Sequence, residues 1–103
     1  MTSNEYHDIL QKFVDAYKAE YNAVPDQFAA DAYDAIYAIK AAIEKSGATA
    51  DMSASELCDA MSAAMTDITL TGLTGTITWE ASGEPNKEPK AVIIENGAYK
   101  AMQ

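Results

Sequence analysis

Hydrophobic side chains recur every three or four residues over the first two thirds of the chain, a pattern that predicts helices. In residues 4–22 the recurring positions are Tyr6, Ile9, Leu10, Phe13, Tyr17 and Tyr21. Residues 26–46 follow Pro25, which suits the first turn of a helix, and they are apolar around most of the helical circumference. A helix of this kind needs cover on more than one side, so we expect it at the centre of the structure.

The ends of the second and third helices carry recognisable signals. Gly47 follows Lys45 and is expected to cap the second helix. Ser53 and Glu56 have the spacing of a capping box and open a third helix over residues 53–66. The short apolar stripe of this helix predicts one buried face.

After Asp67 the hydrophobic period changes from 3.6 to 2, which indicates strands. Strands are expected at residues 76–79, 91–95 and 98–101, with a turn at 72–75 and a polar loop at 81–89. Asn96-Gly97 is the favoured pair for a two-residue type I′ hairpin turn. The sequence therefore predicts an α+β chain of three helices followed by about three strands, with a helical part at 1–67 and strands at 68–103.

The length and charge narrow the possible functions. The chain has 103 residues, 49% of them hydrophobic, and a formal net charge of −9 from 16 acidic and 7 basic residues. All the basic residues are lysines, so a basic face for nucleic acid or for an anionic membrane is not expected. We find no signal peptide and no apolar run long enough to span a membrane.

Candidate catalytic and metal-binding groups are few, so we expect no enzyme, metal or cofactor. The single cysteine, Cys58, and the single histidine, His7, exclude an internal disulfide and a paired-histidine metal motif. Asp31 and Asp34 lie three residues apart and are candidates for an acid/base pair. Since no histidine, arginine or nucleophile completes a set around them, we expect two solvated carboxylates on the polar face of the second helix.

Three further features have a structural and a functional interpretation. The glycines at 72–75 suggest a phosphate loop, but no Gly-Lys-Ser follows them and a turn entering a strand explains them better. Trp79 is either a recognition residue or, as we expect, a half-buried strand side chain. Phe28 stands at the first turn of the most apolar helix, where its ring packs in the core or points past the helix end into a cleft. From chemistry alone we expect the core position.

Several segments together match one family pattern. Phe13–Tyr21 fits F-x-x-x-Y-x-x-x-Y, and Pro25–Ala35 fits P-x-x-F/Y-A-x-x-A-Y-D-A. Gly72–Gly83 fits G-x-T-G-x-I-x-F/W-x-x-x-G. In this order and spacing the sequence resembles the C-terminal segment of the branched-chain amino-acid (Leu/Ile/Val) type of ABC transporter solute-binding protein, which has the type I periplasmic-binding fold. Members are much longer than this chain and close two α/β lobes around a solute.

The resemblance implies a function and a set of roles. It implies an extracytoplasmic protein, periplasmic or lipid-anchored, that captures a small solute such as an amino acid and delivers it to an ABC permease. Phe28 matches an aromatic position that lines the cleft. Tyr33 and the apolar face of the second helix would pack on the sheet of a lobe, and residues 72–78 would belong to the hinge crossing. A single wall of a cleft is expected to bind solute weakly.

Two other functions remain open, and one physical consequence follows. The chain is alternatively a free-standing α+β interaction module without a small ligand, or a sensory or regulatory domain of the same fold. A wide apolar helix face without its sheet drives association. We therefore expect the 103-residue chain to form a homo-oligomer, with helices or strands exchanged between copies as one possible arrangement.

Overall fold

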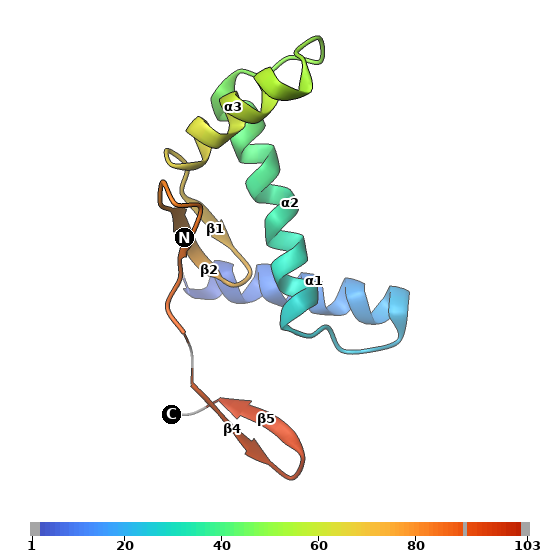
Figure 1. Cartoon of the computed structure of the whole chain (residues 1–103). Helices are drawn as coiled ribbons and strands as arrows, with labels where there is room; N and C mark the ends of the chain where they lie inside the picture. The colour runs from blue at the N-terminus through green and yellow to red at the C-terminus, as the bar shows by residue number, and fades with distance from the viewer. Residues whose placement is uncertain (1–2, 90, 102–103) are drawn as a thin grey trace.

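The computed structural model describes residues 3–89 and 91–101. Three helices come first: α1 (Ser3–Tyr21), α2 (Gln27–Ser46) and α3 (Ala54–Met65). They are followed by five short strands: β1 (Leu70–Gly72), β2 (Gly75–Trp79), β3 (Pro85–Asn86), β4 (Val92–Glu95) and β5 (Ala98–Ala101). The α+β order of helices and then strands is confirmed (Figure 1).

Local signals set the helix ends. Asp26 is the N-cap of α2 and accepts a hydrogen bond from the Ala29 N–H at 2.9 Å. Pro25 therefore lies just before the helix, whereas it was expected in the first turn. Gly47 ends α2 in the left-handed conformation, and Ser53 and Glu56 form the complete predicted capping box of α3. These short-range predictions depend on residues at most four apart.

The strands form two separate antiparallel groups. β1, β2 and β3 make a three-stranded sheet in that order, whereas β4 and β5 form a separate two-stranded sheet among the described residues. β3 lies inside the segment that the sequence analysis predicted as an unpaired polar loop. Pro85, which cannot donate to a ladder, is tolerated in β3 because this strand lies at the edge of the sheet. The β4–β5 turn has positive φ at both Asn96 and Gly97, as a type I′ turn requires.

The core is small and consists mostly of small side chains. Ala42, Ala64 and Ile68 form its centre, and Trp79 packs against them as a partly buried strand residue, as predicted. No large side chain among the described residues is fully buried. The interior is thus a close contact of α2 with α3 and the sheet, made possible by alanines.

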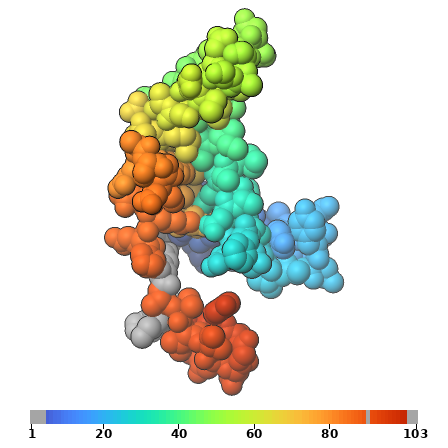
Figure 2. All heavy atoms as spheres, in the orientation of Figure 1, coloured from blue at the N-terminus to red at the C-terminus, as the bar shows by residue number. Residues whose placement is uncertain are grey.

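The shape is extended. α1 crosses beneath one end of α2, α3 lies against the other end, and the β4–β5 hairpin stands apart (Figure 1). The radius of gyration is 16.5 Å, whereas a compact domain of this length has about 13 Å. In the space-filling view the hairpin forms a separate lobe beyond the rest of the molecule (Figure 2). The chain therefore leaves much of its apolar surface uncovered.

Candidate functional site

The centre of the molecule is a joint between α2 and the β1–β2 turn. Asp34, on α2, is 4% exposed. Its Oδ1 accepts a hydrogen bond from the Leu73 N–H at 2.8 Å. Its Oδ2 accepts hydrogen bonds from the Thr74 N–H at 2.9 Å and from the Thr74 hydroxyl at 2.6 Å. One buried carboxylate thus satisfies both N–H groups of the turn.

The joint needs a residue without a side chain at position 72. A Cβ placed on Gly72 would lie 2.6 Å from the Asp34 Cγ, well inside van der Waals contact. The glycine therefore lets the strand end approach the carboxylate. From the sequence, Gly72 was expected in a turn and, through the family resemblance, in the hinge crossing. Its more specific role is to make room for Asp34.

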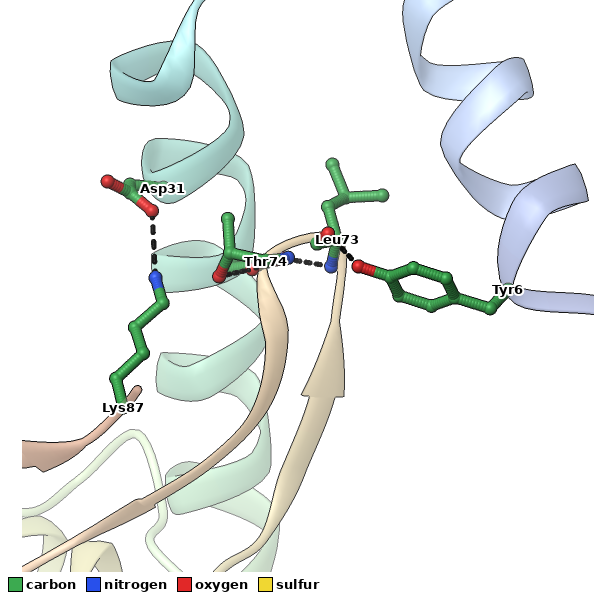
Figure 3. A network of polar contacts seen from close by, with 6 residues as sticks. Tyr6, Asp31, Leu73, Thr74 and Lys87 are labelled. Carbon is green, nitrogen blue, oxygen red and sulfur yellow. Dashed lines mark hydrogen bonds and ion pairs between the residues drawn. The ribbon is translucent and has the colours of Figure 1, made fainter. Parts of the chain in front are cut away.

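A second helix reaches the same turn from the other side. The Tyr6 hydroxyl on α1 donates to the Leu73 carbonyl at 2.5 Å, as Figure 3 shows. Aromatic rings also connect the helices, because the Phe13 ring centre lies 5.0 Å from that of Tyr33. Tyr33 in turn lies 5.0 Å from Tyr37, with its hydroxyl 3.4 Å from the Tyr37 hydroxyl. This hydrogen bond, together with partial burial, raises the pKa of Tyr33 above its usual value.

Asp31 has a different partner from Asp34. Its carboxylate forms an ion pair with Lys87, whose Nζ lies 3.0 Å from Asp31 Oδ1 (Figure 3). Both side chains are partly exposed. The pair ties the segment after β3 to α2. The prediction of two solvated carboxylates is therefore right for exposed Asp31 and wrong for Asp34. The physical reason is that Asp34 shares a helix row with buried Ala38 and Ala42 and finds its donors 39 and 40 residues further along the chain.

Two open pockets lie on either side of Asp34. One, of about 360 Å³, lies between α2, the sheet and the segment that carries Lys87. The other, of about 300 Å³, is lined by residues of α1, α2 and the β1–β2 turn. The Asp34 oxygens already accept hydrogen bonds from the turn, and the Asp31 carboxylate, which lines the first pocket, is paired with Lys87. The arrangement serves packing and positioning, and it supplies no nucleophile paired with a base.

Phe28 lies one helical turn before Asp31 and is 71% exposed. The expectation from chemistry alone, that its ring packs in the core, is wrong because no element of the described chain covers the first turn of α2. An exposed ring beside a helix N-terminus can form a wall against an apolar group. Cys58 is exposed, and the described residues contain no group of three or more metal-binding side chains. No helix in the described part is long and apolar enough to cross a membrane.

Comparison of the amino-acid sequence with known proteins identifies a family. A family model described as periplasmic binding protein matches residues 2–93, almost the whole chain. The chain therefore belongs to the periplasmic binding protein family, whose members bind solutes outside the cytoplasm and are not enzymes. No curated protein and no solved structure gives a significant match.

The matched segments meet in space. The Tyr33-Asp34 step of the α2 motif and the Gly72–Gly75 motif are the two sides of the Asp34 joint. Both motifs are recognisable in the sequence, but their contact in space is not. One signal for a buried Asp34 was present in the sequence. This acidic residue lies on the same face of α2 as Ala38 and Ala42, and that face is otherwise small and apolar.

Proposed function

We propose that this chain is part of an extracytoplasmic binding protein for a small solute, of the branched-chain amino-acid type, that serves an ABC permease. The observation that carries this proposal is the exposed Phe28 at the start of α2, the position where the matched motif has an aromatic residue. Its ring offers an uncovered apolar face, which suits the side chain of an apolar amino acid.

The rest of the site supports this role by fixing α2. Asp34 holds the middle of α2 to the β1–β2 turn, and the Asp31–Lys87 pair holds the preceding turn to the segment after β3. Phe28 is three residues from Asp31 and lies on an adjacent part of the helix surface. In a two-lobed binder, residues 72–78 would lie at the hinge, so that movement there is transmitted to the Phe28 wall through the Asp34 joint.

We infer that one wall is insufficient for tight binding. Solute sites in proteins enclose most of the ligand, whereas Phe28 contacts it from one side. The 103-residue chain by itself is therefore expected to bind amino acids weakly, and high affinity requires a second lobe. The permease recognises the closed form of the complete binder.

The test is calorimetric titration of the complete binding protein with leucine, isoleucine and valine, and with aspartate and lysine for comparison. Replacing Phe28 by alanine removes an apolar contact of about 2 kcal/mol and should weaken the binding of apolar amino acids about thirtyfold. Tyr99→Ala is the matched control because Tyr99 is an exposed aromatic residue outside the proposed site. Absence of heat with every amino acid, or equal affinity in Phe28→Ala and the unsubstituted protein, would refute the proposal.

A further inference from the structure

The β4–β5 hairpin has one apolar face that nothing in the described chain covers. Ile94 pairs directly with Tyr99, so the two side chains point to the same side, and Val92 shares that side. These three residues are 53% (Val92), 75% (Ile94) and 81% (Tyr99) exposed. The opposite side carries Ile93 and the ion pair of Lys100 with Glu95, at 3.0 Å. An isolated two-stranded hairpin is marginally stable in water and gains stability when such a face is covered.

A second uncovered surface runs along α2. Ile36, Ile39 and Ile43 follow at steps of three and four residues and therefore lie on one side of the helix. They are 66%, 47% and 41% exposed, and we call them the α2 strip. The strip extends about 10 Å along the helix axis. A four-residue strand extends about 13 Å, so the apolar face of the hairpin matches the strip in length.

The chain has enough uncovered surface for a stable association. Its accessible surface is 7926 Å², whereas a compact protein of 11.1 kDa has about 5,700 Å². A standard protein interface removes about 800 Å² from each partner, well below this excess. The net charge of −9 opposes contact between copies over most of the surface. The apolar hairpin face carries no acidic side chain, and the charged residue beside the α2 strip is Lys40, which is paired with Glu44.

The position of the hairpin favours contact with another molecule over contact with its own α2. The Lys87–Asp31 pair fixes the segment after β3 to the N-terminal half of α2, and the hairpin extends beyond that end of the helix (Figure 1). The α2 strip runs toward the opposite end. Covering it within one chain would require the hairpin to turn back along α2. In a two-fold pair, each hairpin can reach the strip of the other copy while both stay extended.

We propose that two copies of this chain pair by exchanging their β4–β5 hairpins, so that the Val92, Ile94 and Tyr99 face of each covers Ile36, Ile39 and Ile43 of the other. The contact uses neither Phe28 nor a bound solute. Its test on the 103-residue chain is therefore separate from the test of solute binding, which uses the complete binding protein.

The first test is sedimentation velocity of the 103-residue chain at about 1 to 100 µM, which covers dissociation constants in the micromolar range. We expect a dimer whose dissociation constant rises about thirtyfold or more in Ile94→Lys and in Ile39→Glu. Two matched control variants should leave the dissociation constant within about threefold of that of the unsubstituted chain. Ile93→Lys places the same charge on the other hairpin face. Lys45→Gln makes the same change in net charge as Ile39→Glu, at an exposed residue on the far side of α2 from the strip. A monomer throughout, or a dimer insensitive to Ile94→Lys, would overturn the proposal.

The second test distinguishes exchange between copies from folding back within one chain. Cys58 is exposed and is first replaced by serine. Chains carrying Ile94→Cys are mixed with longer, tagged chains carrying Ile39→Cys and are oxidised. A disulfide-linked species containing one chain of each length is the expected result. If a single chain with both cysteines instead forms its disulfide at monomer mass, while the mixture yields no linked pair, the exchange is refuted.

Discussion

The two tight hairpins of this protein, β1–β2 and β4–β5, are built alike but are attached differently. Each has a two-residue turn that includes or adjoins a glycine, and each has a regular antiparallel register. The β1–β2 turn donates hydrogen bonds to a carboxylate of α2 and accepts one from a hydroxyl of α1. Within residues 3–89 and 91–101, the contacts of the β4–β5 hairpin are its own ladder and one exposed ion pair. Strand pairing alone therefore does not decide whether a hairpin belongs to the core.

The difference comes from side chains that lie far away in the sequence. Asp34 and Tyr6 bind backbone groups of the first turn, and these contacts fix its position relative to two helices. The second hairpin presents apolar side chains without a covering element in the described chain. Hydrogen bonds to a charged acceptor contribute more than neutral ones and are directional, so the first hairpin is expected to move with α2 as one body.

The largest effect is expected from breaking the Asp34 joint. Asp34→Ala leaves the N–H groups of Leu73 and Thr74 without their acceptor in a buried position, and should lower the free energy of unfolding by about 4 kcal/mol. Asp31→Ala is the matched control, because it removes a partly exposed ion pair three residues earlier and should cost less than about 1 kcal/mol. Urea unfolding followed by circular dichroism measures both. Similar costs for the two variants would show that the joint does not anchor the turn.

The joint also shows what could be predicted from the sequence. The helix caps at Gly47 and Ser53 and the turn at Asn96-Gly97 were predicted correctly, because neighbouring residues determine them. Asp34 was expected in solvent because its donors lie 39 and 40 residues away, and helix periodicity does not reveal such a partner. β3 was missed for a similar reason, since a two-residue strand depends on β2 for its pairing. Phe28 was identified through the family pattern, while its exposure follows from the tertiary arrangement.

A smaller effect is expected from adding a methyl group to the joint. Gly72→Ala forces a Cβ against the Asp34 carboxylate and should destabilise the chain by about 2 kcal/mol. In the Asp34→Ala background the obstructing atoms are gone, so the same substitution should cost less than about 1 kcal/mol. A double-mutant cycle by urea unfolding gives this coupling directly. An unchanged cost in the two backgrounds would mean that backbone conformation, and not Asp34, requires the glycine.

The smallest effect on overall stability is expected at the turn of the second hairpin. Gly97 has a φ of 78°, in the left-handed region, where an alanine costs about 1 kcal/mol. Gly97→Ala should therefore shift the hairpin equilibrium toward the open form about fivefold. The measurement is made by NMR in the Ile94→Lys background, where association does not protect the hairpin. The amide exchange of β4 and β5 should quicken, while that of β1 and β2 provides the internal control. Equal acceleration in both hairpins would show that they unfold together, and that the second is part of the same cooperative body as the Asp34 joint.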